Sequence, residues 1–295
     1  MIGHGRQRAV VTEVGATLRS YTVDDVPVLD GFDEGAMSCA GRGQVLAPWP
    51  NRLGDGRYSF DGHTGRAALD EPEHRNAIHG LVRWLPWRML SSAQNVTVLG
   101  CTLYPQPGYP WQLELVVEYR LGRDGLTVST VATNRSETLS PFGIGFHPYV
   151  TVGTESVDAV RLRMPGRRRL VTDERSLPTA DAAVAGTELD FTGGRPVGPT
   201  RLDTAYTDLR RDDDGRARVT LDRVDGARGV TVWLDQSFPY VMLFTGDSLE
   251  PSHRRRRSLA VEPMSCPPDA MRSGKDLVLL EPGVGWRGTW GISPR

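Results

Sequence analysis

The chain has 295 residues, of which 39% are hydrophobic and 24% are charged, and this ordinary globular balance excludes a disordered chain. With 35 basic and 36 acidic residues the net charge is −1, so the chain as a whole has no electrostatic pull toward nucleic acid or an acidic membrane. No apolar run approaches the roughly 20 residues needed to span a bilayer, and we therefore expect a small neutral molecule as the partner.

The first strand signals lie near the N-terminus. Residues 9–29 alternate apolar and polar side chains, with interruptions at Gly15 and at the pair Asp24-Asp25. Residues 113–121 and 126–132 alternate in the same way around a short Gly-bounded turn. This second pattern predicts a β-hairpin.

The second half of the chain continues the pattern. Residues 181–200 are rich in Gly, Pro and Ala and predict a long surface loop. Residues 219–223 and 230–234 predict another hairpin, because a Gly-containing turn separates them. Residues 240–245 and 277–280 are apolar runs that indicate two buried strands.

Helix signals are weak, because no window of twelve or more residues keeps apolar side chains at the i, i+3, i+4 spacing. The 33 glycines and 21 prolines predict frequent turns. Many short strands with frequent turns favour an all-β fold, a β-sandwich or barrel. The composition marks no boundary, so we expect one domain over residues 1–295.

The three cysteines, Cys39, Cys101 and Cys266, are widely separated. No two have the spacing of a metal site, and an odd number does not suggest a disulfide framework. The first residues, MIGHGRQRAVV, lack the basic and then apolar pattern of a signal peptide. These features predict a cytoplasmic protein with reduced thiols.

Several familiar motifs fail on inspection. Residues 283–288 match the GxGxxG pattern, but they leave no room for the helix of a dinucleotide site. Residues 212–215 resemble part of a calcium loop. Such a loop needs Asp at its first ligand position and Glu at its last, but here these positions hold Arg210 and Leu221, so the segment predicts a polar turn. The run Arg254–Arg257 is interpreted as a solvated loop between strands, with a phosphate or nucleic-acid contact as the alternative.

Two segments in the first third of the chain hold chemically capable residues. Asn51 and Arg52 follow two prolines, which make the chain stiff there. An arginine in this place is either a surface charge or a donor of hydrogen bonds to ligand hydroxyls. His79 lies close to Trp84 and Trp87, and it is either a core histidine or part of a sugar cleft with aromatic walls.

Two further segments lie in the second half. His147 stands between Phe146 and Pro148. Apolar neighbours lower the pKa of an imidazole, and the rigid proline fixes its direction. Glu262 ends an apolar run and precedes Pro263. It is therefore either an outward surface acid or a desolvated base.

Together these segments resemble the aldose 1-epimerases, the galactose mutarotase-like proteins, over residues 11–290. Each motif alone is weak, but the set occurs in the order found in that family and is specific at the superfamily level: APWPNRLGDGRYSFDG, NAIHG, FHPYV, LDTAYTDL and VEPMSCPPDA. The resemblance implies a large antiparallel β-sandwich with few short helices and a sugar cleft on one sheet. The sequence HGLVRWLPW departs from the best-known members, which indicates a bacterial side branch and leaves the identity of the sugar open.

Position by position, the resemblance implies that Glu262 is the catalytic base and His147 the catalytic acid. His79 matches the second active-site histidine, and Arg52 matches the arginine of the family's Asn-Arg motif. Asp203 matches the substrate-binding aspartate, with a plain turn residue as the alternative.

Asn51 and Trp84 are expected to contact the sugar as well. The chemistry implied is mutarotation, the exchange of α and β anomers by ring opening, which requires neither cofactor nor metal. A base removes the proton of the C1 hydroxyl while an acid protonates the ring oxygen. We expect Glu262 and protonated His147 on opposite sides of the O5–C1 unit, in a monomer or homodimer.

Three other functions stay open. An epimerase of hexose 6-phosphates would use Arg83 and Arg254–Arg257 for the phosphate. A sugar-binding protein without turnover would keep only the cleft. A glycoside hydrolase or lyase would need two carboxyl groups about the scissile bond, and only Asp203 could accompany Glu262.

Overall fold

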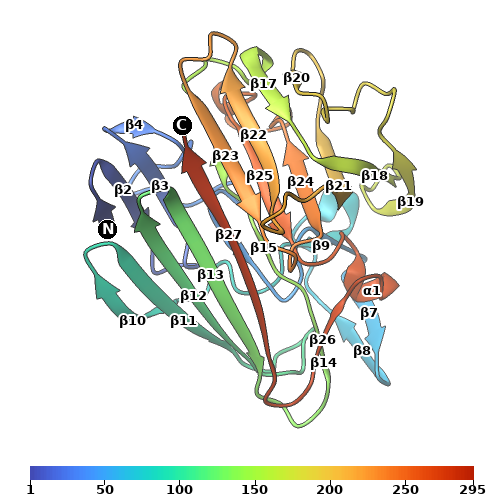
Figure 1. Ribbon diagram of the computed structural model, residues 1–295. Coiled ribbons are helices and arrows are strands. Elements are labelled where there is room, and N and C mark those ends of the chain that lie inside the picture. The colour runs from blue at the N-terminus through green and yellow to red at the C-terminus, as the bar shows by residue number, and fades with distance from the viewer.

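Two large antiparallel sheets pack against each other in a β-sandwich (Figure 1). The computed structural model describes all 295 residues. The first sheet has nine strands in the spatial order β10 (Arg88–Ala93), β11 (Val96–Leu103), β12 (Leu113–Gly122), β13 (Gly125–Asn134), β27 (Gly285–Pro294), β23 (Gly229–Leu234), β22 (Ala217–Arg223), β17 (Val160–Arg163) and β20 (Arg195–Pro196).

The second sheet has eight strands. Their spatial order is β19 (Pro178–Ala183), β18 (Gly166–Thr172), β21 (Asp203–Leu209), β24 (Tyr240–Phe244), β25 (Leu259–Met264), β15 (Gly145–Phe146) and β5 (Val45–Leu46), and β16 (Tyr149–Val150) pairs with β25. The all-β sandwich expected from the strand pattern is therefore confirmed.

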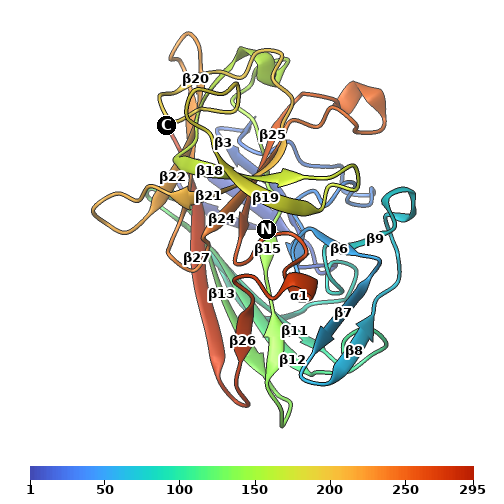
Figure 2. The same ribbon diagram turned by 90° about the vertical axis from the view of Figure 1, so that its right-hand side faces the viewer.

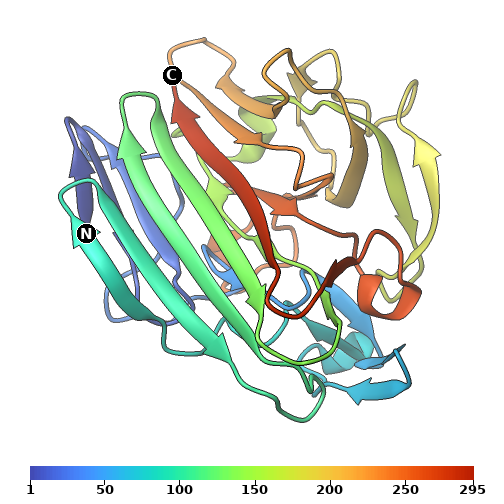
Figure 3. The same ribbon diagram turned by 60° about the horizontal axis from the view of Figure 1, so that its bottom comes forward.

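Small sheets complete the chain. The N-terminal sheet is β1 (Ile2–His4), β2 (Gln7–Val11), β3 (Leu18–Val23) and β4 (Val26–Pro27), and its blue strands lie beside the green strands of the nine-stranded sheet (Figure 3). Three strand pairs are β6 (Arg52–Gly54) with β9 (Asn76–Ile78), β7 (Arg57–Phe60) with β8 (His63–Arg66), and β14 (Ser140–Phe142) with β26 (Val278–Leu280).

Helical structure is limited to single turns. The α-helix α1 (Ala270–Ser273) packs beside β7 at one end of the molecule (Figure 2). The three 3-10 turns are Pro72–His74, Val157–Ala159 and Ser252–Arg254. None of these helices has the length and apolar character needed to cross a lipid bilayer.

Both predicted hairpins are present. In β12 and β13 the residues Gly122 and Gly125 pair across a two-residue turn, and every second side chain of β12 is buried. This burial follows from the strand geometry, which places successive side chains on opposite faces. The second hairpin is β22 with β23.

Three inner strands are buried along almost their whole length. All residues of β23 and β25 are buried, and so are four of the five in β24. One face of such a strand packs in the sandwich core and loops cover the other, so its sequence is a continuous apolar run. A polar residue in β25 therefore loses its contact with bulk water.

Two expectations needed correction. Residues 277–280 were expected to form a buried strand, but β26 pairs only with β14, and Leu279 is 51% exposed because no sheet covers that side. The expected loop 181–200 gives its first three residues to β19 and includes β20. The three cysteines are free thiols, as predicted.

A buried hydrogen bond ties the N-terminal sheet to the sandwich. The hydroxyl of Tyr119 on β12 donates to the carbonyl oxygen of Ala16 at 2.7 Å. We expect Tyr119→Phe to lower the free energy of unfolding by about 1–3 kcal/mol, because the buried carbonyl loses its donor. Urea unfolding measures this loss, and Tyr104→Phe at an exposed position is the control. Equal midpoints for the two variants would contradict the assignment.

Candidate active site

Glu262 lies in the middle of β25, opposite Met242 of β24. Only 2% of its surface is exposed, so the alternative of an outward surface acid is excluded. Burial raises the pKa of Glu262 well above its usual range, and the negative charge of Asp203 adds to this shift. The positive charge of Arg52 acts in the opposite direction but is the smaller influence.

His147 follows β15 and is 4% exposed. Its ring stacks on Tyr149 with centroids 4.9 Å apart and planes within 12°. Burial lowers the pKa of His147 to about 3, and the positive charges of Arg42 and Arg83 contribute. The imidazole is therefore neutral near pH 7, in the direction expected from its apolar neighbours.

The two groups are in direct contact. His147 Nε2 lies 3.3 Å from Glu262 Oε1. We expected them on opposite sides of a sugar, but the structure places them side by side, because β15 and β25 are neighbouring strands of one sheet and His147 directly follows β15. Glu262 Oε2 is buried without a hydrogen-bond partner, so it is free to bind a ligand hydroxyl.

His79 and Asn51 lie just beyond the paired ends of β9 and β6. The backbone N–H of Asn51 donates to Nδ1 of His79 at 3.2 Å, so this nitrogen is unprotonated and Nε2 carries the hydrogen. Both residues have left-handed backbone angles, with φ of 58° and 65°. Such strain in two adjacent non-glycine residues is typical of functional sites.

The ring of His79 also meets His147 edge to face, with centroids 5.3 Å apart. Burial lowers the pKa of His79 well below its usual range, and the nearby His147 adds to the effect. His79 is thus a neutral hydrogen-bond donor beside the pair.

Arg52 is held by carboxylates on two sides. Its Nε and Nη2 donate to Glu71 at 3.0–3.1 Å, and Nη1 lies 3.5 Å from Asp203 Oδ2. Glu71 also accepts a hydrogen bond from Asn76 at 2.8 Å. Sequence reasoning missed Glu71, since it belongs to an acidic stretch before Pro72 that looks like any polar turn.

These residues line one cavity of about 340 Å³, a size suited to a monosaccharide. Six of the predicted site residues line this cavity: Asn51, Arg52, His79, His147, Asp203 and Glu262. Two arginines face six carboxylic residues in the lining, so the cavity has an acidic balance. Among the chain's side chains, no group of three or more His, Cys, Asp or Glu is arranged to hold a metal ion.

The tryptophans of the HGLVRWLPW segment do not line this cavity. Trp87 is buried in the core, where its indole N–H donates to the carbonyl of Val82. Trp84 is 45% exposed and lies beside Arg83, whose guanidinium carbon is 5.5 Å from its ring. The predicted sugar contact of Trp84 is therefore not made by this arrangement.

The arginine run does not reach the cavity either. Arg256 binds Asp158 and Asp247 at 2.8 Å each, and Arg255 pairs with Glu250. Arg254 lies 3.8 Å from Asp30. A plain solvated loop was expected, but Arg254 and Arg256 are half-buried because they fasten this loop to neighbouring segments.

Comparison with known proteins gives one family. The family model described as aldose 1-epimerase matches residues 1–293. The uncharacterized protein YihR of Escherichia coli is 32% identical over 95% of this chain and 87% of its own length. The maltose epimerase of Levilactobacillus brevis is 27% identical over 89% of this chain and 84% of its own.

Solved structures share the fold. An aldose epimerase homologue from C. elegans superposes with a TM-score of 0.88 at 19% identity, over 100% of this chain and 97% of that one. The galactose 1-epimerase of Lactobacillus acidophilus gives a TM-score of 0.81 at 19% identity, over 98% and 91%. At these identities the likeness concerns the arrangement of strands.

The lowered pKa of His147 has a consequence for stability. Between its usual value of 6.5 and about 3, the unfolded chain binds a proton at His147 that the folded protein does not. Acidification through this window therefore destabilises the folded state. We expect His147→Gln to lose less stability than the parent between pH 6.5 and 3 in urea unfolding.

The control for this measurement is His4→Gln, which removes an exposed histidine. Its stability should follow that of the parent across the window. A His147→Gln curve parallel to that of the parent would show that His147 is not buried in its neutral form.

Proposed function

The chain belongs to the aldose 1-epimerase family, and on this premise we propose that it interconverts the α and β anomers of a free aldose by opening and closing the sugar ring. The contact of His147 Nε2 with Glu262 Oε1 carries the proposal. Two proton-transfer groups in contact, beside a cavity of monosaccharide size, suit a reaction that moves one proton onto the ring oxygen and another off the C1 hydroxyl.

The side-by-side placement fits this chemistry. The C1 hydroxyl oxygen and the ring oxygen are bonded to the same carbon, so two adjacent groups on one side of the sugar can serve both. Burial favours the form with the proton on Glu262 and a neutral His147. Transfer of that proton across the 3.3 Å contact produces the carboxylate and the imidazolium without changing the proton count of the pair.

The reaction then balances in protons. Glu262 takes the proton of the C1 hydroxyl, and His147 gives its proton to the ring oxygen as the C1–O5 bond breaks. The aldehyde forms with Glu262 again protonated and His147 neutral, which is the form that burial stabilises. Rotation about C1–C2 and the reverse transfers close the ring on the other face.

The remaining residues orient the sugar in this proposal. The Nε2–H of His79 donates to the ring oxygen or to a neighbouring hydroxyl. Arg52 and Asp203 fix the hydroxyl pattern, and Glu71 holds the guanidinium of Arg52 in place. Asn51 acts through its backbone N–H, which sets the tautomer of His79.

The charges of the cavity favour a neutral aldose. Its acidic lining repels a phosphate group, and Arg83 is already paired with Asp70. The maltose epimerase and galactose 1-epimerase among the similar proteins act on neutral sugars by name. The unpartnered Glu262 Oε2 beside His147 argues for turnover rather than for sugar binding alone. Residues 1–295 act as one catalytic domain, because a continuous core extends from Ile2 to Ile292.

The carboxyl group of Glu262 tests the proposal. We expect Glu262→Gln to lower the rate of anomer exchange by at least about 10²-fold, since the amide cannot accept the C1 hydroxyl proton. Exchange spectroscopy by NMR on galactose, glucose and maltose measures the rate. The control Glu137→Gln changes an exposed residue and should retain full activity. Undiminished exchange by Glu262→Gln with every sugar would refute the assignment.

The imidazole of His147 occupies space that is open only because residue 41 is glycine. Gly41 has a left-handed φ of 72°, and a Cβ there would lie 2.5 Å from Cδ2 of His147. Gly226 has the same φ with open space around it. We expect both Gly→Ala variants to lose a similar, small amount of stability through backbone strain.

Only Gly41→Ala should also lose anomer exchange, by about 10-fold or more, because it displaces the imidazole. The same NMR assay measures this, together with urea unfolding of both variants. Equal activities of Gly41→Ala and Gly226→Ala would contradict the role of His147.

A further inference from the structure

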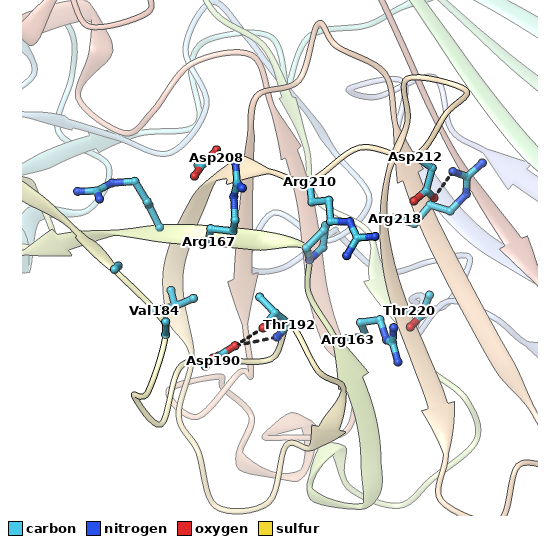
Figure 4. Close-up of a pocket in the computed structure, with 14 residues that line it drawn as sticks. Arg163, Arg167, Val184, Asp190, Thr192, Asp208, Arg210, Asp212, Arg218 and Thr220 are labelled. Carbon is cyan, nitrogen blue, oxygen red and sulfur yellow. Dashed lines mark hydrogen bonds and ion pairs between the residues drawn. The ribbon is translucent and has the colours of Figure 1, made fainter.

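A second cavity, of about 820 Å³, shares no residue with the candidate active site. Its lining includes residues of β17 and β22 of one sheet and of β18 and β21 of the other, and Figure 4 labels ten of the residues around the cavity. Five of its lining residues are arginines: Arg163, Arg167, Arg168, Arg210 and Arg218. We refer to it as the arginine cleft.

Carboxylates neutralise three of these arginines. Arg167 binds Asp208 at 2.8 Å, and Arg168 pairs with Asp181. Arg218 lies between Asp212 and Asp214, at 2.6 and 2.5 Å. These contacts fix the walls of the cleft, and because Arg218 has two aspartates, the three arginines and four aspartates together carry one net negative charge.

Arg163 and Arg210 have no such partner. No carboxylate lies within ion-pair distance of either guanidinium, and neither guanidinium donates a hydrogen bond within the protein. Arg210 donates only through its backbone N–H, to the carbonyl oxygen of Pro165. The third lining aspartate, Asp190, accepts from the N–H and the hydroxyl of Thr192 instead (Figure 4). Five arginines and three aspartates line the cleft, and Arg163 and Arg210 are the two of these arginines that lack an ion-pair partner.

The rest of the lining suits an organic ligand. Pro165, Ala183 and Val184 supply an apolar part of the wall. The volume exceeds that of the active-site cavity and is far larger than an inorganic anion requires. A ligand that fills the cleft would therefore contain both an anionic group and a larger uncharged part.

The two cavities lie at opposite ends of one strand. Asp203, at the start of β21, lines the active site, and Asp208 of the same strand lines the arginine cleft. Five residues of strand span roughly 16 Å. A ligand in the cleft is thus separate from a sugar at His147 and Glu262.

We infer that the arginine cleft is a second ligand site, which binds a small organic phosphate monoester through Arg163 and Arg210. A phosphate monoester carries about two negative charges near neutral pH, which complements the two guanidinium groups that have no ion-pair partner. Guanidinium forks also bind phosphate oxygens in pairs of parallel hydrogen bonds. This site is independent of the reaction proposed for the active site.

Isothermal titration calorimetry of the full chain with glucose 6-phosphate tests the inference. We expect binding to the parent, and Arg163→Ala/Arg210→Ala should weaken it by at least 10-fold. Binding should also weaken from pH 8 to pH 5.5, since the phosphate loses one charge. Inorganic phosphate should compete, whereas glucose should not.

The double variant Arg88→Ala/Arg287→Ala is the matched control. It removes two exposed arginines outside the cleft that have no ion-pair partner, and so makes the same change in net charge. Its affinity should equal that of the parent, and anomer exchange should be unchanged in both double variants. Absence of binding to the parent, equal losses in the two double variants, or displacement by glucose would each overturn the inference.

Discussion

The exclusion of water from β25 is the constraint on which the candidate active site depends. Glu262 and His147 lie inside the sandwich, where an isolated charge is costly, so both groups rest in their neutral forms. One proton then suffices for the pair, and the 3.3 Å contact lets it move between them. In water the carboxyl would stay ionised near pH 7, with no preference for the protonated form that accompanies the open-chain aldehyde in the proposed reaction.

The surrounding residues serve to hold this pair in a narrow space. Gly41 leaves room for the imidazole only because it has no Cβ, and Tyr149 fixes the ring from one face. Asn51 and His79 keep left-handed backbone angles, which the paired strands β6 and β9 maintain next to them. The ion pair of Arg52 with Glu71 anchors a cation near the pair without neutralising Glu262 directly. Short segments that directly flank paired strands therefore set most of the geometry.

The sequence predicted the sandwich because alternation and turns are local signals, as in the hairpin of β12 and β13. It also located Glu262, His147, His79 and Arg52, since their motifs are short and lie beside prolines and glycines. It could not predict contacts that depend on long-range packing. From the sequence, Glu71 resembled an acidic residue of a polar turn, Trp84 was expected to contact the sugar, and Arg256 was expected to be solvated. In the tertiary structure Glu71 binds Arg52, Trp84 lies beside Arg83, and Arg256 binds Asp158. The side-by-side placement of Glu262 and His147 was not predicted for the same reason: strand order is not visible in one sequence.

The net charge of −1 conceals a separation of charge along β21. At one end, six carboxylic residues and two arginines line the active-site cavity, and at the other end two arginines lack partners in a cleft with five. Charges of opposite sign cancel in the total but act locally, because the screening length in physiological salt is about 8 Å. The two cavities are separated by about twice that distance along the strand. The proposed neutral sugar and the inferred anionic ligand thus meet different local charges on one small protein, which the whole-chain charge alone does not indicate.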